Sequence, residues 1–155
     1  MRYDYEDYIE ALSSKNPTEN LRRMVNANLE AGVEDWLIMC HLDSIRLKAI
    51  NPANQAILLD AISALSPHFQ KHQGVPDSNI QKLIDEAHNR KVTNPDALIN
   101  LVRNLRAQGL DKGGILFELE VYRRGPNIRY EEDDDDIMGV MDMLWGWCRP
   151  ELRID

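Results

Sequence analysis

The 155-residue chain has only two cysteines, Cys40 and Cys148, which lie far apart and form no CxxC pair. Disulfide scaffolds need more cysteines, and an isolated thiol usually serves as a small buried apolar residue in a reducing compartment. We therefore expect a cytoplasmic protein. A chain of this length buries about 68–70% of its unfolded surface and can hold a core without cross-links.

Long hydrophobic runs are also missing, and the longest uninterrupted one covers residues 36–40. A membrane-spanning helix needs about 20 such residues. The first seven residues carry a net negative charge and precede no apolar stretch, which predicts neither a signal peptide nor a transit peptide. The sequence thus predicts no association with a membrane.

Positive charge is in short supply, with 18 Lys and Arg against 26 Asp and Glu and a net charge of −8. Nucleic-acid affinity comes largely from basic side chains that neutralise phosphates, so this balance disfavours nucleic-acid binding. A basic protein is the natural electrostatic complement of such a chain.

Apolar residues recur at helical spacing through nearly the whole sequence. Tyr5, Tyr8, Ile9 and Leu12 fall at positions i, i+3, i+4 and i+7, which place them on one face of a helix. Comparable stripes cover residues 21–29, 38–49, 52–65, 80–87, 98–105, 111–124 and 137–148. No alternating, β-branched run competes with them, so the sequence predicts an all-α fold of about eight helices.

Several dipeptides mark expected helix boundaries. Asn-Pro occurs at residues 16–17, 51–52 and 94–95, and each pair places a good N-cap before a proline at the first helical position. Ser66 and Pro67 open a short turn in the same way. Gly32 stands where a C-terminal cap needs positive φ, and Pro150 is expected to end the last helix.

The order of these patterns suggests an internal duplication within a single domain spanning residues 1–155. Leucine, valine and glycine recur at a constant offset in residues 21–33 and 98–110. Taken singly, each match is explained by the leucine spacing that amphipathic helices share, and only the common order favours duplication. The halves would be residues 1–73 and 77–149, four helices each, joined by a polar loop and packed together.

The most unusual feature is a run of six acidic residues, here called the acidic run. It comprises Glu131, Glu132, Asp133, Asp134, Asp135 and Asp136. One or two carboxylates stabilise the N-terminus of a helix, whereas six in a row repel one another. The run contains no glycine turn of the kind a calcium loop needs, so we expect no metal there. Two interpretations remain, a solvated face and a surface for a basic partner.

Two tryptophans, Trp145 and Trp147, follow the acidic run. Residues two apart on a helix point about 200° apart, so both indoles cannot lie on the expected apolar stripe. Tryptophan is often an interface anchor, while surrounding charge steers association. The sequence therefore predicts a protein-binding surface formed by the acidic run with Trp145 or Trp147. One form would be an inhibitor or immunity-type protein that covers a basic active site.

Two alternatives belong to other functional classes. A small helical enzyme would use His41, His68 or His72 with carboxylates in a cleft, although we interpret His68 and His72 as a surface pair and His41 as a core-edge residue. A helix-turn-helix around Gly32 or Gly109 would bind DNA, but the segments after these glycines are acidic and apolar. No nucleotide, nucleophile-elbow or metal-ligand motif is present, so we expect no cofactor and favour binding over catalysis.

Overall fold

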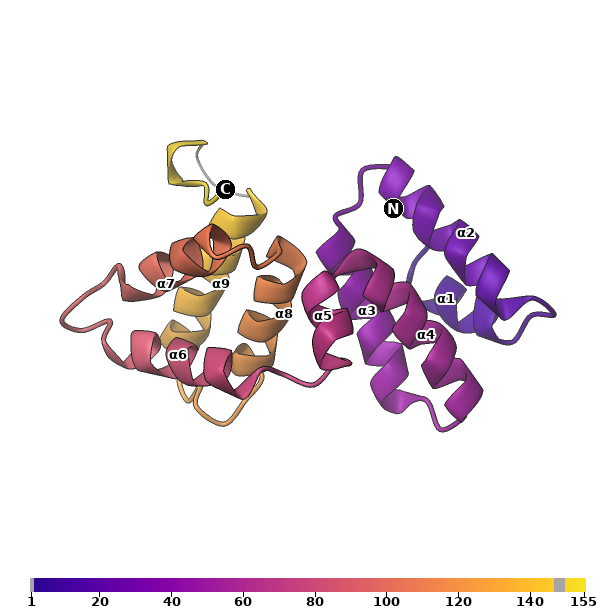
Figure 1. Cartoon of the computed structure of the whole chain (residues 1–155), viewed down its shortest axis with the longest axis horizontal. Helices are drawn as coiled ribbons and strands as arrows, with labels where there is room; N and C mark the ends of the chain where they lie inside the picture. Colours follow the sequence, from indigo (N-terminus) through magenta and orange to yellow (C-terminus); the bar gives the residue numbers. More distant parts are fainter. Residues whose placement is uncertain (1, 147–149) are drawn as a thin grey trace. The chain divides into compact units, whose positions relative to one another are not determined.

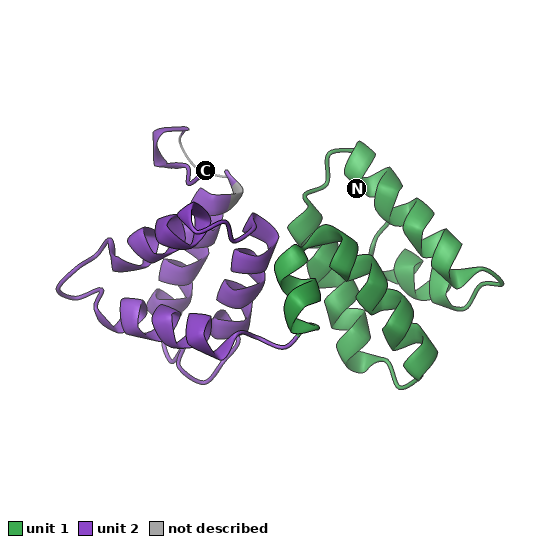
Figure 2. Ribbon diagram, viewed as in Figure 1, with its two compact units in different colours: residues 1–74 green, residues 75–155 purple. Residues whose placement is uncertain are grey.

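The computed structural model describes residues 2–146 and 150–155, with only the backbone at Trp145. Across these residues it contains nine α-helices, one short 3₁₀ helix and no strand, which confirms the predicted all-α class. The chain divides into two compact units, Met1–Gly74 and Val75–Asp155 (Figure 2).

The described residues of the first unit form five helices (Figure 1). They are α1 (Tyr5–Leu12), α2 (Pro17–Glu30), α3 (Asp35–Lys48), α4 (Pro52–Leu65) and α5 (Pro67–His72). Helix α3 packs along α4, while α1 contacts α2 and α3 and α2 contacts α4. The predicted stripes supply fully buried side chains to this core, including Tyr8, Leu21, Ile38, Leu42 and Leu58.

A buried amide in α2 fixes the start of the chain in the first unit. Asn28 is fully buried, and its Oδ1 accepts hydrogen bonds from the backbone N–H groups of Arg2 and Tyr3, both at 3.0 Å. Its Nδ2 donates to the Tyr3 carbonyl at 2.9 Å and to the Tyr8 hydroxyl. These four bonds satisfy the amide and tie the N-terminal segment to α2.

Across its described residues, the second unit contains four α-helices and the 3₁₀ helix (Figure 1). They are α6 (Ser78–Asn89), α7 (Ala97–Ala107), α8 (Lys112–Arg123), α9 (Glu131–Trp145) and η1 (Pro150–Leu152). Helix α8 contacts α6, α7 and α9, and α6 also packs against α7. Ile137, Val140, Met141 and Leu144 are buried, as their stripe on the last helix predicts.

One of the predicted Asn-Pro helix starts is wrong. Helices α2 and α4 begin at the proline after Asn16 and Asn51, and α5 begins after Ser66, whose hydroxyl accepts from the N–H of Phe69. Helix α7 instead begins at Ala97, with Asp96 as its N-cap. A turn occupies the expected start, because the carbonyl of Asn94 accepts the N–H of Ala97 at 3.1 Å.

Two expected helix ends have different outcomes. Gly32 has φ +85° after α2, as the cap interpretation requires. Helix α9, however, ends at Trp145 rather than near Pro150, because Gly146 adopts φ +94° and closes it. Pro150 opens η1 instead. Residues 67–72, expected as a turn, form α5, so the described part of the chain has nine α-helices rather than eight.

Candidate functional site

The acidic run forms the first turns of α9. Its N-cap, Tyr130, is extended and provides no side-chain hydrogen bond, so the helix start has no side-chain cap. The four carboxylates of the first turn therefore supply the negative charge that the helix dipole favours. Asp135 and Asp136 lie beyond this turn, where the effect of the dipole falls off.

Lys91, in the connection after α6, binds two members of the acidic run. Its ammonium group donates to Asp133 and to Asp136, the latter at 3.0 Å. The hydrogen bond from Lys91 holds the pKa of Asp133 below its ordinary value, and the same bond raises the pKa of Lys91. His88 Nε2 lies 3.4 Å from the same Asp133 oxygen. Asp133 thus has two partners from the end of α6 and the segment that follows it.

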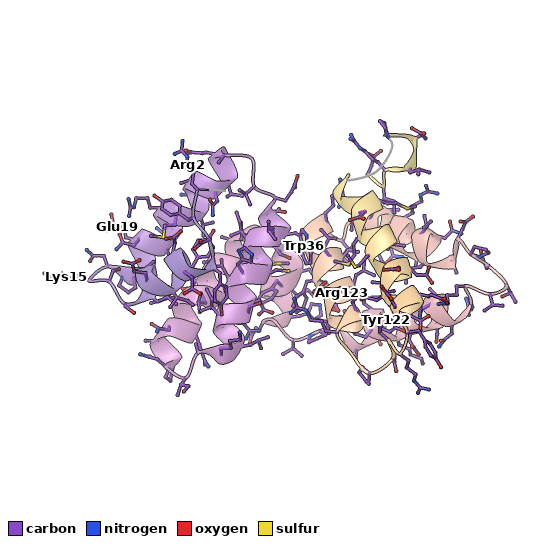
Figure 3. The ribbon with its side chains drawn as sticks, turned by 180° about the vertical axis from the view of Figure 1, so that it is seen from behind. Arg2, Lys15, Glu19, Trp36, Tyr122 and Arg123 are labelled. Atoms are coloured by element: carbon purple, nitrogen blue, oxygen red, sulfur yellow. The ribbon has the colours of Figure 1, made fainter. Side chains whose placement is uncertain are left out.

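Arg123, at the end of α8, binds a third carboxylate of the run. It donates to Asp134 at 3.1 Å and to Glu120, one turn back, at 2.8 Å (Figure 3 labels Arg123). The hydrogen bonds with Glu120 are the main cause of its raised pKa. Arg124 also binds Glu120, at 2.7 Å. These pairs neutralise two of the arginines that a DNA-binding face would require.

The acidic run therefore consists of two groups of side chains. Asp133, Asp134 and Asp136 are bound to cations brought from elsewhere in the second unit. The other three, Glu131, Glu132 and Asp135, are exposed and form no ion pair within residues 2–146 and 150–155. Within the acidic run, the charge not balanced by internal cations lies on these three residues, which we call the open carboxylates.

A pocket of about 350 Å³ lies beside the acidic run in the second unit. Helix α9 forms one side, and the end of α6, the connection after it and α7 form the other. The lining residues are His88, Lys91, Pro95, Leu98, Ile99, Asp135, Asp136, Gly139, Val140 and Met143. The pocket thus combines an aliphatic wall with two carboxylates from the acidic run.

Gly139 contributes bare backbone to this pocket. It lies inside α9 and is not among the glycines with positive φ. A Cβ built on it would meet no heavy atom within 4 Å outside its own helical neighbourhood. Neither backbone conformation nor packing in the described structure therefore requires glycine at this position.

His88 forms part of the pocket wall and is only 5% exposed. Its Nδ1 is buried and has no hydrogen-bond partner within the described residues. Its ring meets the Tyr122 ring edge-on at 5.7 Å, and the Tyr122 hydroxyl donates to Asp85 at 2.8 Å. Burial, followed by this hydrogen bond, raises the pKa of Tyr122.

Sequence reasoning assigned no role to His88 or Lys91, although both contact the acidic run. Lys91 and Asp133 are 42 positions apart, and no local spacing pattern relates them. The lack of basic residues near the acidic run in the sequence is misleading for the same reason, because it does not show contacts between distant positions. No Lys or Arg compensates the acidic run within residues 131–142, whereas the folded chain brings Lys91 and Arg123 to it.

The histidines proposed for an enzyme occupy other positions. His68 and His72 lie on α5 with ring centroids 4.4 Å apart, but His68 is 5% exposed, so the surface-pair interpretation is wrong for this residue. His41 is partly buried and meets the Tyr5 ring edge-on at 6.4 Å, in agreement with a core-edge residue. Burial lowers the pKa of His41.

The predicted tryptophan anchors are only partly located. Trp145 is the last residue of α9, and its side chain lies outside the described part of the structure, as does the whole of Trp147. Elsewhere, the described residues contain no group of three His, Cys, Asp or Glu side chains suited to a metal ion. None of the described helices has the length and apolar content that crossing a bilayer requires.

Comparison with known proteins found no match among protein-family models, curated protein sequences or solved structures.

Proposed function

We propose that the chain is a protein-binding module that recognises a basic protein partner through the acidic run. The observation that carries this proposal is the exposure of Glu131, Glu132 and Asp135, which have no cationic partner within the described residues. Internal cations already fix the other carboxylates of the run. The candidate contact surface is thus narrower than the whole run and centres on the open carboxylates.

Folding accounts for only part of this surplus, because Glu131 and Glu132 lie in the first turn of α9 and Asp135 lies beyond it. A helix dipole interacts favourably with charges in the first turn, by about 0.3–1 kcal/mol each, and the effect falls off beyond that turn. Asp133 and Asp134 are first-turn residues with internal cations as well. Adding Glu131, Glu132 and Asp135 increases repulsion between like charges. A basic partner would relieve that repulsion and gain from electrostatic steering.

An inhibitor or immunity-type protein is the concrete form we favour. Such a protein would place the open carboxylates over the basic active site of a nuclease or toxin and imitate its phosphate ligand. Trp145 or Trp147 remains the predicted apolar anchor of this interface. A cytoplasmic location belongs to the same proposal and depends on the low cysteine content.

Affinity capture followed by mass spectrometry tests the proposal. The wild-type chain is compared with a triple variant, Glu131→Gln, Glu132→Gln and Asp135→Asn. The matched control removes three exposed carboxylates from the first unit, by Glu6→Gln, Glu10→Gln and Glu19→Gln. We expect a protein of net positive charge to bind the wild type and the control, and to be lost from the α9 variant.

The salt dependence of the purified complex provides the second readout. The Debye length, over which the interaction between exposed charges is screened, is about 8 Å at physiological ionic strength. The affinity of the complex should therefore fall steeply as salt rises from low to moderate concentration. Affinity that does not change with salt, or equal loss of binding in both triple variants, would refute recognition through the open carboxylates.

A small hydrolytic enzyme is the second candidate, favoured by the 3.4 Å approach of His88 to Asp133 beside the pocket. His88 could act there as a general base. The Asp133 carboxylate is already bound to Lys91, however, and none of the described residues lining the pocket has a hydroxyl or thiol. Screening hydrolysable substrates with wild type and His88→Gln tests this candidate. Activity lost in that variant would support it over the binding module.

A further inference from the structure

We propose that the pocket over Gly139 receives the side chain of a lysine or arginine from the partner. The inference rests on the proposed function only for the origin of that side chain. The pocket itself belongs to the second unit and can be tested without the partner.

The composition of the pocket matches a side chain with an aliphatic stem and a cationic end. Leu98, Ile99, Val140 and Met143 form an apolar wall, while Asp135 and Asp136 lie at the same pocket. Lysine and arginine bury their methylene groups on apolar surface and keep the charged group in a polar environment. A shorter polar side chain would leave the wall uncovered, and a purely apolar one would leave Asp135 without a cationic partner.

The charge balance favours a cation over an anion. Lys91 supplies one ammonium group, which is shared between Asp133 and Asp136. Asp135, exposed and without an ion pair in the described residues, adds a third carboxylate. One ammonium group and three carboxylates leave two negative charges. The ammonium or guanidinium of a partner would reduce that excess.

The presence of glycine at position 139 distinguishes this pocket from a surface that is only acidic. Glycine inside a helix lowers stability relative to alanine, and here neither φ nor steric crowding requires it. A larger side chain would project into the pocket that Gly139 lines. The glycine therefore leaves room for a ligand to approach the backbone of α9, where folding by itself favours alanine.

Binding of blocked amino acids tests the inference directly. The probes are the N-acetyl, N-methylamide derivatives of lysine, arginine and norleucine, the last being an aliphatic stem without charge. Titrations are followed by the NMR shifts of the Val140 and Met143 methyl groups. We expect lysine or arginine to bind at least about fivefold more tightly than norleucine, since a charge pair worth about 1 kcal/mol corresponds to that ratio. Comparison of the lysine and arginine titrations identifies the preferred cation.

Three variants locate the binding. Gly139→Leu fills the pocket and should abolish the shifts, while circular dichroism and the thermal midpoint confirm that the variant folds. Asp135→Asn should reduce the preference for the cationic probe over norleucine. Glu131→Gln removes the same charge from the acidic run at a residue that does not line the pocket, and should leave the preference unchanged.

Equal binding of norleucine and the cationic probes would overturn the inference, as would unchanged shifts in folded Gly139→Leu. Loss of the cation preference in Glu131→Gln to the same extent as in Asp135→Asn would also overturn it. Failure of the proposed function gives a different result. Partner capture would then be unaffected by the triple variant, while lysine or arginine still binds at Gly139.

Discussion

The ammonium group of Lys91 is bound to the carboxylate of Asp133, although 42 positions separate them in the sequence. The same ammonium reaches Asp136. This contact joins the connection after α6 to the start of α9 and fixes one edge of the pocket. It also explains why the acidic run is not uniform, because some of its carboxylates stabilise the second unit and others remain open.

Lys91→Met should lower the thermal midpoint at neutral pH by removing the ammonium group that binds Asp133 and Asp136. The pKa of Asp133 is lowered in the folded protein, so its contribution is present above the unfolded value near pH 4 and is lost as pH falls through the folded pKa. The pKa of Lys91 is raised, so its contribution disappears as pH rises beyond about 10.4 and through the folded pKa. Thermal midpoints across this range measure the effect.

Lys82→Met is the control for that experiment, because Lys82 is an exposed lysine of α6 without an ion pair in the described residues. The difference in thermal midpoint between wild type and Lys91→Met should become smaller at both pH extremes. The thermal midpoint of Lys82→Met should follow that of the wild type at every pH. Parallel curves of thermal midpoint against pH for wild type and Lys91→Met would contradict the contact with Asp133.

Tyr122→Phe should make the protein less sensitive to alkaline pH. Burial raises the pKa of Tyr122, so wild-type stability declines as pH rises above about 10, where the unfolded tyrosine ionises. Phenylalanine cannot ionise and removes this decline. At pH 7 the variant should lose about 1 kcal/mol, because the hydrogen bond to Asp85 is gone while the ring remains.

Urea unfolding of Tyr122→Phe at pH 7 and pH 11 provides the measurement. Tyr130→Phe is the control, since Tyr130 is 71% exposed and should change stability little at pH 7. If Tyr122→Phe retains the wild-type loss of stability at pH 11, ionisation of Tyr122 does not cause that loss.

The helical class was predictable because it depends on local periodicity. The stripe that includes Ile137 and Leu144 fixes which face of α9 is buried without any knowledge of its neighbours. Helix boundaries were less predictable where tertiary turns compete with capping preferences. The turn around Asn94 delays α7 by two residues, and Gly146 ends α9 before the expected proline.

The candidate site was only half predictable. The sequence shows that residues 131–136 are acidic, but the electrostatic energy depends on distance in space rather than on separation along the chain. Lys91 and Arg123 become partners only after α6, α8 and α9 have packed. The pocket is also a tertiary feature, since Leu98 and Gly139 come from different helices and neither belongs to a binding motif.

Asn28→Ala should destabilise the first unit by about 2–3 kcal/mol, because it removes a buried amide that satisfies several polar groups. The N–H groups of Arg2 and Tyr3 would lose their acceptor. Urea unfolding measures the loss, and hydrogen exchange should show faster exchange at the Tyr3 amide. Asn26→Ala, an exposed change in the same helix, should leave that amide protected.

Gly139→Ala should stabilise the protein, while Gly109→Ala in the same unit should destabilise it. A Cβ meets no atom within 4 Å at either position, so steric crowding does not distinguish them. Gly109 has φ +93°, where an L side chain costs about 1–2 kcal/mol, whereas Gly139 lies in regular helix, where alanine gains about 0.5–1 kcal/mol. The midpoints of urea unfolding should therefore move in opposite directions at constant m value. A lower midpoint for Gly139→Ala would show that folding itself requires this glycine. A higher midpoint together with weaker binding of the lysine or arginine probe would show that stability at this position is given up for the pocket.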